Sequence, residues 1–205
     1  IAGDEGQGAR PLHPGGGANQ LRVRAYNERL VLSLVRRNVG LSKADIARLS
    51  GLSAQTVSVI MRALEKDGLL KRGDPVRGKV GKPSIPMALD PDGVFSFGLK
   101  IGRRSAELIL MDFVGTVRAS LNEAYKYPTP DGIRKFVRAS VEQLSRGLST
   151  MHRQRIAGIG IAAPFELWNW VEEVGAPPED MSAWREVDLI DIIGEIVPFP
   201  VFQQN

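Results

Sequence analysis

The sequence predicts a two-module chain of mixed class, in which a small α+β module precedes a layered α/β module. Helical apolar spacing recurs three times between residues 20 and 68, and a turn-rich stretch with short apolar runs follows to residue 89. From residue 90 to residue 205, the patterns come in the order β-β-β-α-β-α-β, which is typical of an α/β layer. Residues 1–19 are glycine-rich and polar, and we expect them to form a disordered tail.

Composition excludes several classes of protein. The 205 residues include no cysteine, which excludes disulfides and thiolate metal sites and favours a reducing compartment, the cytoplasm. His13 and His152 are the only histidines, so we expect no metal site and no cofactor. No apolar run approaches the roughly 20 residues that span a membrane, and the N-terminus lacks the apolar core of a signal peptide. We therefore expect no membrane partner.

Positive charge is concentrated in the first module. Residues 20–82 carry 14 Lys+Arg against 5 Asp+Glu, a net of +9, whereas residues 83–205 carry 12 against 16, a net of −4. This distribution favours a phosphate-facing module beside an acidic module with another purpose. A solvated basic face is the alternative, and the charge alone does not decide between them.

The first two helices are predicted from spacing and caps. Tyr26, Leu30 and Leu34 lie four residues apart and predict a helix over residues 21–38. Ser42 predicts the start of a second helix, because Asp45 three residues later resembles the acidic partner of a capping box. Gly51 predicts the end of that helix, as the left-handed residue that follows its last turn.

A third helix follows, with Ser53 as its predicted N-cap. The residues expected to face the core are Val57, Ile60, Met61 and Leu64. Two short helices with a glycine turn, and a polar edge on the second, are typical of a helix-turn-helix that places its second helix in the DNA major groove. The candidate DNA contacts are Ser42, Ser53, Gln55, Thr56, Ser58 and Arg62. The alternative is a plain three-helix bundle with a hydrated polar face.

Residues 69–89 predict a β-hairpin wing, because the stretch contains the turn formers Gly73-Asp74-Pro75 and Gly78. A basic wing usually lies along the phosphates or reaches into the minor groove. The candidate contacts here are Arg77, Lys79 and Lys82. For any one of them an ordinary solvated linker is the alternative.

The second module is predicted to begin near Pro91 and Gly93. Alternating apolar residues predict its strands, and an amphipathic pattern predicts its long helix. The predicted strands cover residues 94–102, 106–113, 115–124, 156–163 and 200–202, and the predicted helices cover residues 131–149 and 189–196.

Several motifs occur in a fixed order along the chain: GKP at residues 81–83, GIGIAAP at 158–164, APPEDMSAW at 176–184 and PVFQQN at 200–205. With residues 27–70 and the hairpin at 97–115, they resemble transcriptional regulators of the ROK family (repressor, open reading frame, kinase). The resemblance implies that residues 20–89 form a winged helix-turn-helix and that 90–205 form the first lobe of an actin-like, ribonuclease-H-like domain. It also implies that the chain ends midway through that domain.

The sugar kinases of this family carry Asp-x-Gly-x-Thr in the first hairpin. Here Lys100 and Arg104 stand in place of that Asp and Thr, so no carboxylate remains there to bind magnesium. The kinases' general-base Asp directly follows the Asn that Asn205 resembles, and the chain ends at Asn205. We therefore expect no kinase activity and no catalytic residue.

The same resemblance makes Asn205 the candidate sugar-binding residue, since its counterpart contacts sugar hydroxyls. Trp168, Trp170 and Trp184 could stack on a sugar, but packing in the core or on the surface is the commoner role of tryptophan.

These observations predict a sequence-specific transcriptional regulator of carbohydrate metabolism genes, and by resemblance a repressor. We expect it to bind a double-stranded DNA operator as a homodimer and to respond to a sugar or sugar derivative. Two alternatives stay open: a second module that only dimerises and senses nothing, and a sugar kinase fused to a DNA-binding module, which Lys100 and Arg104 disfavour.

Overall fold

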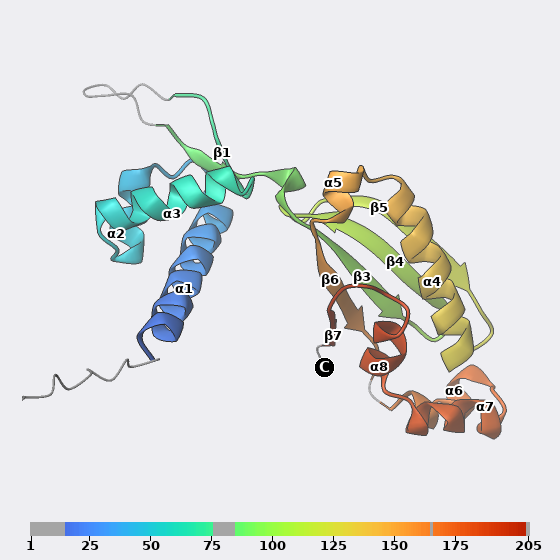
Figure 1. Cartoon of the computed structure of the whole chain (residues 1–205). Coiled ribbons are helices and arrows are strands. Elements are labelled where there is room, and N and C mark those ends of the chain that lie inside the picture. Colours follow the sequence, from blue (N-terminus) through green and yellow to red (C-terminus); the bar gives the residue numbers. More distant parts are fainter. Residues whose placement is uncertain (1–14, 76–84, 165, 204–205) are drawn as a thin grey trace, which may run out of the picture. The chain divides into compact units, whose positions relative to one another are not determined.

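The computed structural model describes residues 15–75, 85–164 and 166–203, and it divides into two compact units (Figure 1). The first unit contains the chain up to Leu64 together with Arg72–Ala88, and the second contains Glu65–Lys71 together with the chain from Leu89. Each unit is described by itself.

The described part of the chain up to Leu89 holds three helices and two short strands, although Glu65–Lys71 and Leu89 belong to the second unit. These elements are α1 (Gly15–Arg37), α2 (Lys43–Ser50), α3 (Ala54–Lys66), β1 (Leu70–Arg72) and β2 (Met87–Leu89), and the two strands pair in one sheet. Helix α1 begins six residues before its predicted start, so residues 15–19 are helical rather than part of a disordered tail. Extending an existing helix costs far less than nucleating one, and this allows glycine-rich residues to join it. The rest of the predicted tail lies outside the described residues.

The connection between α2 and α3 forms as the sequence predicts. Asp45 N donates to Ser42 Oγ over 3.2 Å, and Ser42 N donates to Asp45 Oδ2 over 3.1 Å, which completes a reciprocal capping box. Gly51 adopts the left-handed conformation with φ of 70°, and its N–H bonds back to Ala47 O. Both ends of α2 are therefore set by local side chains and by one glycine.

The core of the first unit comes from all three helices. Val31 and Val35 of α1 are buried, as are Ile46 of α2 and the apolar face of α3. The four residues of α3 predicted to face the core are all buried: Val57, Ile60, Met61 and Leu64. Because one face of α3 is buried in this core, the opposite face is available to solvent or to a partner.

The second unit is built on a five-stranded mixed sheet. Its strands are β3 (Phe95–Ile101), β4 (Ser105–Asp112), β5 (Val117–Ala124), β6 (Ile156–Ala162) and β7 (Val201–Gln203), in the spatial order β5-β4-β3-β6-β7. The strands β3, β4 and β5 are antiparallel neighbours, while β6 pairs in parallel with both β3 and β7. This is the strand order of an actin-like, ribonuclease-H-like lobe, and the predicted fold class is confirmed.

Helices cover one face of this sheet, as Figure 1 shows for α4. The helices of the second unit are α4 (Pro130–Arg146), α5 (Thr150–Arg153), α6 (Val171–Val174), α7 (Pro178–Ser182) and α8 (Leu189–Gly194), with 3-10 turns at Pro91–Gly93, Leu167–Asn169 and Ala183–Glu186. Alternate residues of β3 and β4 are buried against them, including Phe97, Leu99 and Leu108, and α4 contributes Ile133 and Val137.

Among the element boundaries of the second unit that differ from the prediction, two have a clear local reason. Strand β5 begins at Val117 rather than at 115, because the carboxylate of Asp112 accepts hydrogen bonds from Val114 N at 3.1 Å and Thr116 N at 2.8 Å and holds these residues in a turn. The long helix α4 ends at Arg146 rather than at 149, because Ser149 starts the separate helix α5 by accepting from His152 N.

The segment Glu65–Lys71 groups with the second unit rather than with the helices before it. Arg155 Nη1 donates to Gly93 O over 2.8 Å and to Asp67 O over 3.1 Å, and Asp90 N donates to Leu69 O over 3.0 Å. These bonds connect the end of the helical segment to the residues just before β3. The sequence analysis instead predicted that the boundary between the two modules lies at residue 90.

Candidate nucleic-acid interface

The exposed side of α3 carries the side chains that the sequence assigned to base contacts. Gln55 and Arg62 are exposed, and Thr56 and Ser58 are half-buried. Arg62 Nε donates to Ser58 O over 3.1 Å, so the guanidinium lies along the helix. The structure therefore brings Gln55, Ser58 and Arg62 onto one helix that begins at a tight turn and exposes its N-terminal end.

Ser42 and Ser53 act as helix caps. Thr56 N donates to Ser53 Oγ over 3.1 Å, and the hydroxyls of Ser53 and Thr56 lie 2.8 Å apart. Ser42 Oγ donates to Asp45 Oδ2 over 2.6 Å, and this bond comes first among the causes that hold the pKa of Asp45 below its usual value. Both serines position the start of a helix, and their contacts with DNA stay predictions.

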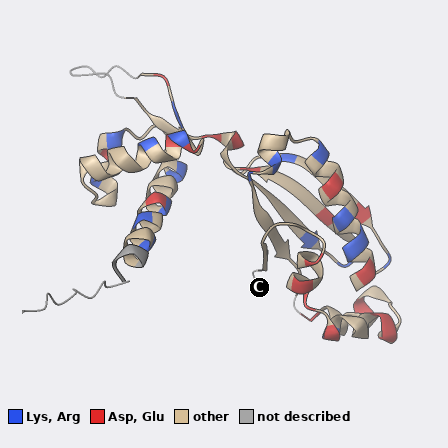
Figure 2. Ribbon diagram, viewed as in Figure 1, with Lys and Arg blue, Asp and Glu red and all other residues tan. Residues whose placement is uncertain are grey.

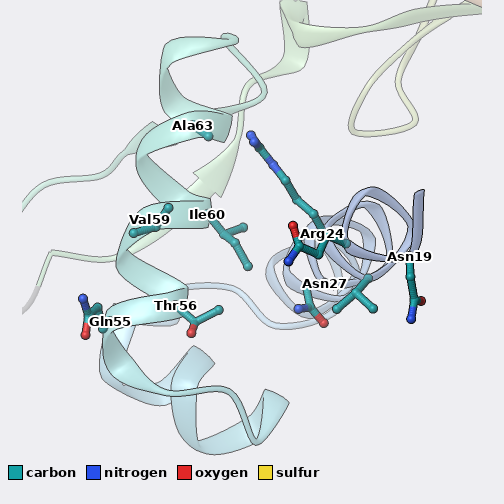
Figure 3. Close-up of a pocket in the computed structure, with 10 residues that line it drawn as sticks. Asn19, Arg24, Asn27, Gln55, Thr56, Val59, Ile60 and Ala63 are labelled. Carbon is teal, nitrogen blue, oxygen red and sulfur yellow. The ribbon is translucent and has the colours of Figure 1, made fainter. Parts of the chain in front are cut away.

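A groove of about 690 Å³ runs between α1 and α3 (Figure 3). From α1 it is lined by Asn19, Gln20, Val23, Arg24 and Asn27, and from α3 by Gln55, Thr56, Val59, Ile60 and Ala63. Sequence reasoning missed Val59 and the α1 residues as candidates, because it searched α3 for polar side chains only. The spacing contained the signal for Val59, which lies four residues after Gln55 and therefore on the same face.

The base of the wing is described, and its tip is not. Gly73 N donates to Pro86 O over 2.8 Å, and Met87 N donates to Leu41 O over 2.9 Å, which ties the hairpin to the residue before Ser42. Lys71 and Arg72 are exposed on β1. The predicted contacts Arg77, Lys79 and Lys82 lie outside the described residues, and they stay predictions.

The charge pattern follows the sequence count. Figure 2 shows Lys and Arg along α1, whereas Asp and Glu gather on α6 and α7. Exposed basic side chains close to α3 include Arg48 and Arg62, although Arg48 pairs with Asp45 over 3.0 Å. A positive first unit attracts a phosphate backbone, and an acidic second unit does not.

The second unit contains a cavity of about 440 Å³ near the carboxyl ends of β6 and β7. Its lining includes Glu166, Trp168, Trp184, Arg185 and Gln203. Trp184 is buried, and its Nε1 donates to Pro128 O over 3.0 Å, which agrees with a packing role. Asn205, the predicted sugar contact, lies outside the described residues.

The hairpin turn between β3 and β4 is held by contacts to neighbouring backbone. Arg104 Nη1 donates to Val174 O over 3.0 Å and also to Lys126 O. Arg103 lies over the ring of Trp170, 5.2 Å from its centre. In this structure the two arginines therefore fasten the turn to the segment around α6.

No group of His, Cys, Asp and Glu in residues 15–75, 85–164 and 166–203 has the arrangement of a metal site. Over the same ranges, no helix combines the length and apolarity needed to span a membrane.

Comparisons with known proteins agree with this architecture. Residues 24–71 match a family model described as winged helix-turn-helix DNA-binding. The xylose repressor of Bacillus spizizenii is 24% identical over 190 residues, which cover 92% of this chain and 48% of the repressor. The Escherichia coli DNA-binding transcriptional dual regulator NagC is 29% identical over 123 residues, covering 58% of this chain and 29% of NagC.

A solved structure shows the same fold. It is a ROK family transcriptional regulator, homologous to the E. coli MLC protein, with a TM-score of 0.58 and 18% identity over 89% of this chain and 46% of that one. The match covers about half the length of two curated xylose repressors.

The helices, wing base and sheet define a winged helix-turn-helix protein that carries part of an actin-like domain. The relatives share both parts in the same order, since their matches run across most of the chain. The chain is similar to transcriptional regulators of the ROK family in both parts.

Proposed function

We propose that this chain acts as a sequence-specific transcriptional repressor that binds double-stranded DNA as a homodimer in the cytoplasm. The exposed face of α3 carries the proposal, because a capped helix that presents Gln55, Ser58 and Arg62 can enter a major groove and bond base edges. The net charge of +9 over residues 20–82 supplies the attraction to phosphate.

Control by a sugar or sugar derivative is the second part of the proposal. It is supported by relatives named xylose repressor and by the cavity beside Trp168 and Gln203. Ligands of open α/β sheets bind outside the carboxyl ends of parallel strands, and this cavity lies at that end of β6 and β7. An aromatic ring with polar neighbours is suited to a sugar. Asn205 is proposed to contribute to the same site.

We propose no catalytic activity. Lys100 is exposed on β3, and Arg104 is bonded to the carbonyls of Val174 and Lys126, so neither residue supplies the carboxylate or hydroxyl that a phosphate site with magnesium requires. Genes of carbohydrate metabolism are the proposed targets, by analogy with the relatives' names.

The DNA part is tested by gel shift against duplexes from upstream of candidate target genes, over a salt series. Gln55→Ala is expected to weaken binding to the preferred duplex and to relax base preference, because it removes a bidentate amide. Lys79→Ala is expected to weaken binding to all duplexes alike and to reduce the salt slope by about 1. Gln154→Ala, an exposed glutamine of the second unit, is the matched control.

If Gln55→Ala and Lys79→Ala bind as the wild type does across the salt series, these contacts are wrongly assigned. The sugar part is tested separately by calorimetry with a panel of monosaccharides and their phosphates. We expect one class to bind, to lose affinity in Gln203→Ala, and to change the affinity for DNA. Binding of none would favour a second module that only dimerises.

A further inference from the structure

We propose that Val59 reads thymine by contact with the 5-methyl group in the major groove, an inference that rests on the proposed DNA binding. Val59 is 54% exposed at the middle of α3, although removing a valine side chain from water lowers the free energy of the protein. Within the described residues, no other part of the first unit covers it. Its position among the candidate base contacts of α3 leaves this apolar side chain free to contact an apolar group of a base.

The neighbours of Val59 identify the partner as DNA. Gln55 precedes it by four residues and Arg62 follows by three, so the three side chains form one ridge along α3. Figure 3 shows Gln55 and Val59 on the same side of the helix. A glutamine and an arginine on such a ridge are donors and acceptors for adenine and guanine edges. The valine between them therefore faces the base pairs in between.

Thymine has the one large apolar group that a base presents in the major groove. The groove between α1 and α3 offers a matching surface, since Val59 is joined there by the small side chain of Ala63 and by Val23 of α1. Side chains that can form hydrogen bonds border this surface, including Gln20 and Asn27. The apolar strip is thus narrow and flanked by polar groups, as methyl readout requires.

The test isolates the methyl group. The full chain is used to enrich a duplex from a random-sequence library, and each T·A pair of that duplex is then replaced by dU·A, which removes only the methyl. We expect one or two of these replacements to weaken wild-type binding about fourfold each, the factor equivalent to burying one methyl group. In Val59→Ala the same replacements are expected to change binding by less than about 1.5-fold.

Val39→Ala is the matched control, because Val39 is an exposed valine of the first unit that does not line the groove. It is expected to keep the full penalty for dU. Since both valines are exposed, neither variant should lower the thermal midpoint by more than about 2 °C. A fall in DNA affinity therefore reports a lost contact rather than lost folding.

Four results would overturn the inference, and they differ in what they say about function. Failure to enrich any duplex removes the proposed DNA binding and this inference with it. Enrichment of a duplex whose dU·A replacements have no effect, or a Val59→Ala variant that keeps the penalty, removes the inference alone. Unchanged dU penalties together with loss of self-association in Val59→Ala, measured by sedimentation without DNA, would assign this face to a second copy of the chain.

Discussion

The capping box of α2 allows a prediction whose size follows from the structure. Ser42 Oγ accepts from Asp45 N over 3.2 Å and donates to Asp45 Oδ2 over 2.6 Å, so Ser42→Ala removes the cap and leaves the N–H of Asp45 without its partner. Loss of such a cap costs about 1 kcal/mol of unfolding free energy. For a module of roughly 70 residues that cost lowers the melting temperature by about 4–8 °C.

The chain offers a clean assay for this effect. All three tryptophans, Trp168, Trp170 and Trp184, lie in the second unit, so tryptophan fluorescence follows that unit alone while circular dichroism at 222 nm follows both. We expect Ser42→Ala to shift the dichroism transition of the first unit and to leave the fluorescence transition in place. Ser58→Ala, within α3, is the control and is expected to change neither by more than about 0.5 kcal/mol.

A second variant tests whether the two side chains act as one unit. Asp45→Ala removes the same reciprocal bonds from the other side, so Ser42→Ala combined with Asp45→Ala should lose less than the sum of the single losses. Losses that add fully would refute the reciprocal box. So would a Ser42→Ala variant whose first transition coincides with that of the wild type.

Three further perturbations test other parts of the structure. Asp112→Asn is expected to destabilise the second unit by about 1–3 kcal/mol. Burial opposes ionisation of Asp112, but the bonds from Arg118 and the turn outweigh it and lower its pKa, so the deficit should shrink as pH falls below the usual aspartate range in urea melts. Gly158→Ala would place its methyl 2.6 Å from Pro200 O, and we expect loss of β7, visible as early cleavage after β6 in limited proteolysis. Gly51 is left-handed, and a Cβ added there would meet no neighbouring atom within 4 Å. Gly51→Ala should therefore lower the unfolding free energy, measured by thermal melts, only by the backbone strain of about 1 kcal/mol.

Much of the first unit could be predicted from the sequence because its determinants are local. The caps at Ser42 and Ser53 and the left-handed Gly51 act within four residues of where they stand in the chain. The apolar stripe of α3 likewise follows from its spacing, and its burial left the opposite face to the candidate DNA contacts. Gln55 and Arg62 are exposed as the prediction required, but the exposed Val59 was overlooked, since apolar residues were assumed to belong to the core.

In the second unit, the sequence pattern predicts the strands but not the long-range contacts. Alternation along the strands identified β3, β4 and β6 to within about two residues, because that pattern needs no partner to be visible. The alternation could not predict the hydrogen bond from Trp184 to Pro128, because these residues lie 56 positions apart in the chain. Nor could it show that Arg104 reaches Val174, 70 residues away. The cavity near Gln203 depends on such long-range contacts.

By itself, then, the sequence determined the helix-turn-helix, the order of the strands with α4 and α8 along the second module, and the separation of charge between the two halves. These properties are local or additive, so they can be summed from neighbouring residues. Only the tertiary structure decided the spatial order β5-β4-β3-β6-β7, the attachment of residues 65–71 to the second unit through Arg155, and the groove in which Val59 stays exposed. Each of these features depends on which surfaces, distant in the sequence, pack together. Packing and the hydrogen bonds between those surfaces decide this as the chain folds.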